Sequence, residues 1–201
     1  LRPGTIVYVT FLPGSDFNAT VETVSRLKRE GFYPIPHFAA RSIESEKILE
    51  EGLERLKEEA DTTEALLIGG GVDNPLGPFS ASIEVLRTGL FDKYGFKKIV
   101  VACHPEGSTD ITPQECAQAI QEKNDFSCHT DADLYLATQF LFEAEPLFKW
   151  EKAIRGQGNK LPIHVGIPGL ATIPTLIRHA RQCGVGPSVR FLKKNPIDLF
   201  K

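Results

Sequence analysis

The sequence predicts an α/β protein built on a parallel sheet. Six short runs rich in β-branched and other apolar residues recur along the chain, and each is followed by a segment with helical spacing of apolar positions. The runs are almost continuously apolar rather than alternating, which is typical of strands covered on both faces. No composition shift or low-complexity stretch interrupts the 201 residues, so we expect one domain over residues 1–201.

The first two strand-helix units carry clear local signals. The first strand is expected over Thr5–Phe11. Asn18 is expected to cap the helix that follows, and Gly31 to end it. The second strand is expected over Tyr33–Ala40. Its helix is expected over Ser45–Ala60, where leucines recur at helical spacing.

The later units repeat the same order. Strands are expected over Glu64–Gly71 and Lys97–Pro105, with a helix over Ser80–Tyr94 between them. Thr112 begins the next helix, with Pro113 at its first position and Glu115 at the capping-box position. The remaining elements are strands over Leu134–Phe142 and Pro162–Gly169 and helices over Pro146–Gly156 and Thr172–Cys183.

Two parallel architectures fit this order, an open doubly wound sheet and a (β/α)8 TIM barrel. A dinucleotide-binding GxGxxG motif would follow the first strand of many doubly wound sheets, and Gly69–Gly71 comes later without that spacing. The barrel is therefore favoured. Because a whole barrel takes about 250 residues, we expect this chain to lack the first and last strands. The chain contains no Met, so we also expect missing sequence at its amino terminus.

Composition excludes several partners. Lys and Arg number 23 against 26 Asp and Glu, for a net charge of −3, so neither a nucleic acid nor an anionic membrane is expected as a partner. No apolar run approaches the roughly 18 residues of a membrane span. The four cysteines form no CxxC pair, which fits a reducing cytoplasm. His37 and His104 lack the spacing of metal ligands, and no metal site is predicted.

Candidate site residues follow from the rule that ligands bind at the carboxyl ends of parallel strands. His37 is compatible with a ligand contact and, equally, with a hydrogen-bonded core histidine. The amide of Gln139 is costly to bury within an apolar run, which favours a ligand contact. Asp73 fits either a ligand contact or a turn. The glycines at 69–71 favour close approach of a flat ligand to the backbone. The polar residues and glycines at the expected strand ends are Thr10, His37, Gly69–Gly71, Asp73, His104, Glu106, Gln139, Gly166 and Gly169.

Several of these segments, taken together and in order, resemble the methylenetetrahydrofolate reductase family. The run PHFAARSI resembles the family's PHLTC segment, and ATQFLF resembles its ITQFFFD segment. The likeness extends over nearly the whole chain. It also includes VYVTF, ALLIGGGVDNP, ACHPEG and HVGIPGLATIPTLIRHARQCGVGPS.

The resemblance implies a cytoplasmic enzyme of one-carbon metabolism. Such a barrel binds FAD at the strand ends, oxidises NAD(P)H and reduces a methylene folate to the methyl folate. Gln139 would contact the folate substrate, and Asp73 would be the carboxylate near the pterin and the flavin ring. The residues implied as flavin contacts are Thr10, His37, Gly71, Ala102 and His104.

The chain also departs from the family pattern. The arginine of the family's Arg-Gly-Asp is absent from Gly71-Val72-Asp73, and matching the Asp requires a one-residue shift. His104 replaces a stacking tyrosine. Ser108 stands where the family has a histidine, and the family's lysine falls near Cys128. These losses should weaken FAD binding.

Two other functions therefore stay open. One is a barrel with little or no flavin that transfers a hydride directly or takes part in methyl transfer. The other is a folate-binding or regulatory barrel without catalysis. The family carries its general acid on its first strand, and this sequence begins at the segment that resembles the second strand, so no residue is named for that role. Association into a homo-oligomer is also left open.

Overall fold

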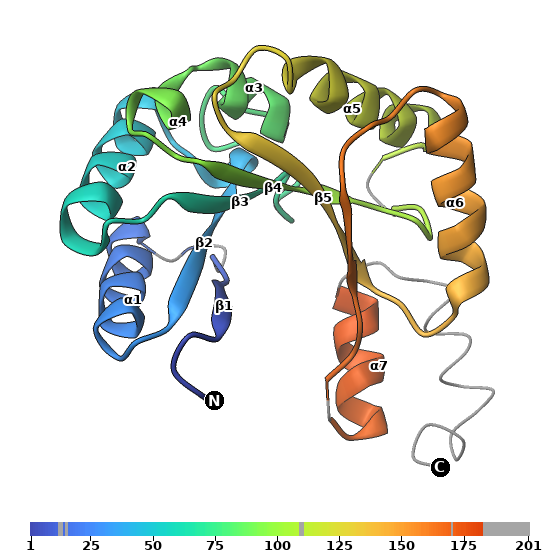
Figure 1. Ribbon diagram of the computed structural model, residues 1–201, viewed down its shortest axis with the longest axis horizontal. Helices are drawn as coiled ribbons and strands as arrows, with labels where there is room; N and C mark the ends of the chain where they lie inside the picture. The colour runs from blue at the N-terminus through green and yellow to red at the C-terminus, as the bar shows by residue number, and fades with distance from the viewer. Residues whose placement is uncertain (12–13, 15, 109–110, 170, 183–201) are drawn as a thin grey trace. The chain divides into compact units, whose positions relative to one another are not determined.

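The structure is a computed structural model and describes residues 1–11, 14, 16–108, 111–169 and 171–182. It divides into two compact units. The first contains Leu1–Ala102 and Phe126–Tyr135. The second contains Cys103–Asp125 and the chain from Leu136 onward. The predicted α/β class is confirmed, because strands and helices alternate along the described chain (Figure 1).

The strands form a sheet in the order β1-β2-β3-β4-β5-β6. The pairs β1–β2, β2–β3, β3–β4 and β5–β6 are parallel, as predicted. A doubly wound sheet reverses its strand order near the middle, whereas a barrel keeps sequence order. The strands are β1 (Ile6–Val9), β2 (Tyr33–Ala39), β3 (Glu64–Ile68), β4 (Lys98–Cys103), β5 (Asp133–Phe140) and β6 (Ile163–Gly166).

Helices connect successive strands. One short 3-10 helix, η1 (Ala40–Ser42), follows β2 directly. Within the described part of the chain, none of the helices is both long and apolar enough to span a bilayer. The α-helices are α1 (Phe17–Arg29), α2 (Glu46–Ala60), α3 (Ser82–Arg87), α4 (Leu90–Lys93), α5 (Pro113–Phe126), α6 (Ala144–Gly156) and α7 (Ile173–Gln182).

The helix ends test the capping predictions. Asn18 was predicted to be the first cap, and this is wrong. The carboxylate of Asp16 accepts a hydrogen bond from the Asn18 backbone N–H at 3.0 Å, so the cap lies two residues earlier than predicted. Gly31 does end this helix, with a φ of +86° just after the C-cap. The capping box between Thr112 and Glu115 is confirmed, because each side chain bonds the other's backbone N–H, at 3.3 and 2.7 Å.

The single helix predicted over Ser80–Tyr94 is two helices. Gly89 lies between α3 and α4 with a φ of +72°, in the left-handed region that ends a right-handed helix. The predicted strands also extend too far at their carboxyl ends, since glycine and proline there form loops. The end of the helix predicted to reach Cys183 lies outside the described residues.

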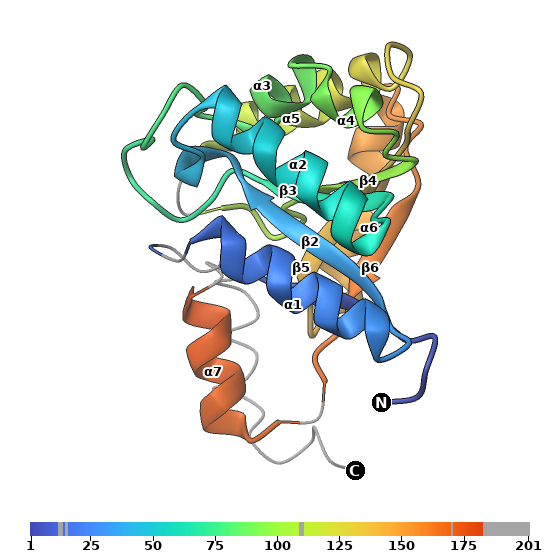
Figure 2. The ribbon, with the colours of Figure 1, turned by 90° about the vertical axis from the view of Figure 1, so that its left-hand side faces the viewer.

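An aromatic chain forms the core of the first unit. Phe38 of β2 packs against Phe17 of α1 and Phe91 of α4, with ring centroids 5.2 Å apart in both cases. Phe91 in turn contacts Phe96 at 5.1 Å. Helices α1 and α2 lie side by side along this face of the sheet (Figures 1 and 2). Because successive strand residues point to opposite faces, His37 points away from these helices.

Candidate functional site

The carboxyl ends of β1, β2 and β4 bring three of the predicted site residues to one edge of the sheet in the first unit. Thr10 is the first residue after β1, and His37 lies at the same level of β2 because Val9 pairs with Pro36. Ala102 is the second-to-last residue of β4. Ligand sites of parallel α/β sheets lie at this edge.

His37 is the most informative of these residues. Its Nε2 atom is buried and has no hydrogen-bond partner among the described residues. The ring lies edge-on to Tyr8, with centroids 5.8 Å apart and planes at 62°. Burial lowers the pKa of His37 from 6.5 to about 4, so the imidazole is neutral at physiological pH. The hydrogen-bonded core histidine and the ligand contact considered above both stay predictions, and no described residue bonds this nitrogen.

A polar layer lies next to His37 on the same face. Tyr8 and Tyr135 form a hydrogen bond between their side chains. Burial, together with this bond, raises the pKa of Tyr135, so its hydroxyl stays protonated at physiological pH. Glu64 pairs with Lys98 at 3.6 Å across β3 and β4. The bond to Tyr135 therefore holds the Tyr8 side chain, whose ring lies edge-on to His37.

The three glycines after β3 have different roles. Gly70 has a φ of +94°, which requires glycine. A Cβ at Gly69 would lie 3.3 Å from Arg41 Nη2, and one at Gly71 would meet nothing within 4 Å. The first two are therefore explained within the protein. Gly71 alone borders open space, as close approach of a ligand requires. Asp73, two residues further on, is exposed.

Arg41, which the sequence analysis did not select, organises the loop after β3. Its backbone N–H donates to Gly69 O at 3.0 Å, and its Nη1 donates to Val72 O at 3.0 Å. The Leu76 N–H donates to Arg41 O at 2.8 Å. The signal in the sequence that could have identified Arg41 is its position as a basic residue directly after a predicted strand.

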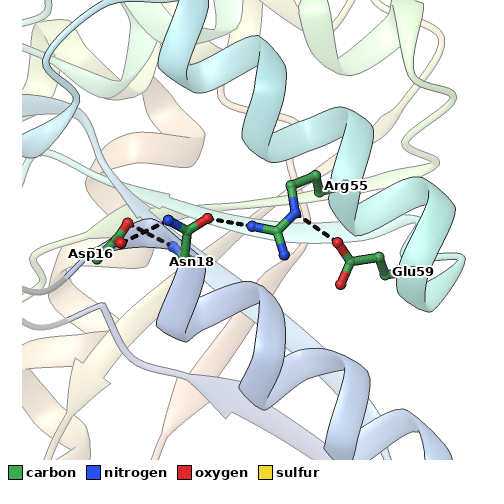
Figure 3. A network of polar contacts seen from close by, with 4 residues as sticks. All are labelled: Asp16, Asn18, Arg55 and Glu59. Atoms are coloured by element: carbon green, nitrogen blue, oxygen red, sulfur yellow. Dashed lines mark hydrogen bonds and ion pairs between the residues drawn. The ribbon is translucent and has the colours of Figure 1, made fainter.

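A cavity of about 390 Å³ opens between the starts of α1 and α2 in the first unit. Its volume falls in the range of small-molecule sites. Beside it, Asp16 bonds Asn18, Asn18 accepts from Arg55, and Arg55 donates to Glu59, which ties α1 to α2 (Figure 3). The lining is mainly apolar and consists of Phe11, Gly14, Asp16, Phe17, Phe38, Ala39, Ser42, Ile43, Glu44, Ile48, Leu49 and Leu76.

The other two predicted residues, His104 and Gln139, belong to the second unit. Gln139 lies in an irregular stretch of β5, where Ala137 pairs with His164 but Phe140 pairs with Gly166. One extra residue in β5 makes a bulge, and bulges redirect side chains next to many sites. The Gly166 N–H donates to the Thr138 hydroxyl at 2.9 Å and stabilises this bulge. His104 is half-buried directly after β4.

The second unit also buries a lysine that the sequence analysis missed. Lys123 of α5 is 6% exposed, and burial lowers the pKa of its amino group. Cys103 and Cys116 interact electrostatically with it, and burial raises the pKa of Cys103 to about 12. The sequence signal was a charged residue in helical register with Cys116 and Ile120 on the apolar face of α5.

The chemistry available at the strand ends of the first unit suits an organic ligand. The imidazole of His37 and the hydroxyl of Thr10 can hydrogen-bond ligand oxygens or nitrogens, and Gly71 leaves its backbone open. Among the residues that the structure describes, no three His, Cys, Asp or Glu side chains gather closely enough to hold a metal ion.

Comparison with known proteins supports the fold alone. No family model matches this chain. A solved structure described as "a putative lyase/mutase from Burkholderia cenocepacia J2315" is similar, with a TM-score of 0.51 and 14% sequence identity. The match covers 79% of this chain and 56% of that one, so this chain spans little more than half the length of its structural relative.

Proposed function

We propose that this protein is a flavin-dependent oxidoreductase that reduces 5,10-methylenetetrahydrofolate to 5-methyltetrahydrofolate with NAD(P)H. The observation that carries the proposal is the unpartnered Nε2 of neutral His37, level with Thr10 on the face opposite α1 and α4. A buried imidazole nitrogen without a partner is costly, and a bound ligand would satisfy it. The family resemblance of the surrounding segments supports a flavin and a folate as the ligands.

The residues of the first unit fit a flavin ring. His37 would hydrogen-bond the ring through Nε2, and the Thr10 hydroxyl would bond it from the neighbouring strand. Gly71 and Ala102 have small side chains, or none, and would let a flat ring approach the backbone. His104 would add a contact from the residue after β4.

A bound flavin would supply the hydride transfer between NAD(P)H and the folate. The carboxylate of Asp73 would stabilise the positive charge that develops on the folate as its iminium forms. Gln139, in the bulge of β5, would orient the pterin through its amide. The neutral state of His37 places no cation beside the ring at physiological pH.

For the architecture we propose a (β/α)8 barrel of which the present chain carries six consecutive units. The sequential strand order supports it, as does the likeness to a solved structure that is longer than this chain. A complete barrel would bring all six strand ends to one rim.

The visible spectrum of the full-length protein tests the proposed activity. A yellow protein that oxidises NAD(P)H when methylenetetrahydrofolate is added is the expected result. His37→Gln should weaken FAD binding roughly tenfold, the cost of about one hydrogen bond to a buried group. The matched control His129→Gln changes an exposed histidine and should bind FAD like the parent.

A colourless protein that FAD does not activate would refute the flavin proposal. Folate binding, followed by fluorescence, would then distinguish the two remaining functions. A protein that still binds the folate and transfers its one-carbon group would act in methyl transfer, and one that only binds would be regulatory.

A further inference from the structure

We propose that Arg41, together with the glycine loop after β3, forms a binding site for an oxyanion carried by a small molecule, either a phosphate or a carboxylate group. The proposal concerns the first unit alone and does not depend on which redox chemistry the protein performs. Arg41 lies in η1, directly after β2, at the edge of the sheet where ligands of parallel α/β proteins bind.

Among the described residues, the charge of Arg41 has no counter-charge. The side chain is half-buried, and none of the ion pairs between described residues includes its guanidinium. Removing an unpaired charge from water is costly, so a half-buried guanidinium is most stable with a counter-anion. Two other arginines in this unit differ in this respect: Arg26 pairs with Glu30, and Arg55 pairs with Glu59.

Most of the hydrogen-bonding capacity of Arg41 is also unused. A guanidinium has five N–H donors, and among the described residues it makes one hydrogen bond, from Nη1 to Val72 O at 3.0 Å. Nε is buried without a partner among the described residues. Planar guanidinium groups with adjacent free donors bind carboxylate and phosphate oxygens in pairs.

The site is held in shape before any ligand binds. The Arg41 N–H donates to Gly69 O, and the Leu76 N–H returns a bond to Arg41 O, which locks the arginine to both ends of the loop. Gly70 adopts a φ of +94° within this loop. Left-handed residues in glycine-rich loops turn successive backbone N–H groups toward one side, an arrangement that favours anions. Gly71 borders open space, which leaves room for the anion.

Calorimetry of the full-length protein with two probe anions tests the proposal. Inorganic pyrophosphate represents a phosphate source, and glutarate represents a carboxylate source, at constant sodium chloride. Measurable binding of either anion is expected, and the tighter one identifies the source. Arg41→Gln should weaken it at least tenfold. Arg41→Lys, which keeps the charge and loses the planar fork, should weaken it less.

The controls separate binding from loop architecture. Arg26→Gln removes a surface charge of the same sign and should bind the anion like the parent. If Arg41→Gln does not fold, as its circular dichroism would show, the comparison of Arg41→Lys with the parent decides. Binding of neither probe to the parent, or an equal affinity in every folded Arg41 variant, would mean that the arginine only fastens the loop and would overturn the proposal.

Discussion

Phe17 at the start of α1 packs directly on Gly52 of α2. A Cβ at Gly52 would overlap the aromatic ring and lie 2.6 Å from Phe17 Cδ1. The absence of a side chain at Gly52 therefore lets the first turn of α1 approach α2 and places Phe17 in contact with both Phe38 and the cavity. The helical spacing of the sequence showed that Gly52 belongs to the buried face of α2, but not which residue would occupy the space.

Replacing Gly52 with alanine should destabilise the first unit despite the better helix propensity of alanine. Overpacking of a filled interface costs about 1–3 kcal/mol, which exceeds the gain of roughly 0.5–1 kcal/mol expected from propensity. Urea unfolding of Gly52→Ala measures the difference. Gly156→Ala in α6 is the matched control, since a Cβ there would meet nothing within 4 Å, and it should be neutral or stabilising. Equal effects of the two substitutions would contradict the close packing of Phe17.

The burial of His37 predicts a pH dependence of stability. The folded pKa is about 4, below the ordinary value of 6.5, so between these values the unfolded chain binds a proton that the folded chain does not. Stability should fall as the pH is lowered through this window, by up to about 3 kcal/mol. Denaturant unfolding at a series of pH values should show the loss in the parent and in His129→Gln, but not in His37→Gln. A parallel loss in His37→Gln would assign it to other groups.

Asp16 should stabilise the start of α1 through its acceptor oxygens more than through its charge. Both oxygens bond Asn18, and these bonds lower the pKa of Asp16. Asp16→Ala should lower the melting temperature, whereas Asp16→Asn, which keeps one acceptor, should recover part of the loss. Since the folded pKa is depressed, the contribution of Asp16 should be present at neutral pH and disappear as the pH falls through that pKa. Identical melting of both variants at neutral pH would rule out a capping role.

Replacing Gln139 should weaken folate binding and change the stability of the fold little. Its side chain is half-buried in the β5 bulge, where the pairing with β6 and the Thr138 hydroxyl, which accepts from the Gly166 N–H, keep the strand in place. Gln139→Ala should weaken folate binding roughly tenfold, the cost of about one lost hydrogen bond in a buried site. Gln114→Ala, at an exposed position of α5, serves as the control. Folate affinity equal to that of the parent would remove Gln139 from the site.

Lys123 should make the free energy of unfolding depend on pH in the alkaline range. Burial lowers the pKa of Lys123 in the folded chain below the ordinary value of 10.5. Between these two pKa values the unfolded chain binds a proton at this amine that the folded chain does not. The parent should become more stable as the pH rises toward that value, and Lys123→Met should lack this gain. Thermal melts in buffers of increasing pH provide the measurement. The same slope in both proteins would show that the amine ionises equally in both states.

Local signals in the sequence determined the elements of this protein and their order. The capping box at Thr112 and Glu115, the left-handed Gly31 and the apolar runs of the strands depend on residues close together in the chain, and these predictions are confirmed. The same local reasoning failed at Asn18 and at Gly89, where a neighbouring acceptor and a left-handed turn moved the helix ends. The sequence also indicated that His37 is a polar residue within an apolar strand, and the structure places it in β2; its role as a ligand contact stays a prediction.

The tertiary structure alone decided what surrounds these residues. His37 lies edge-on to Tyr8 from another strand and finds no partner for Nε2 among the described residues, and Arg41 donates to the carbonyl of Val72, 31 residues away. Burial and hydrogen-bond partners are set by chain segments that meet only on folding, so spacing along the sequence cannot report them. That is the reason why Arg41 and Lys123 emerged from the structure and not from the pattern of residues.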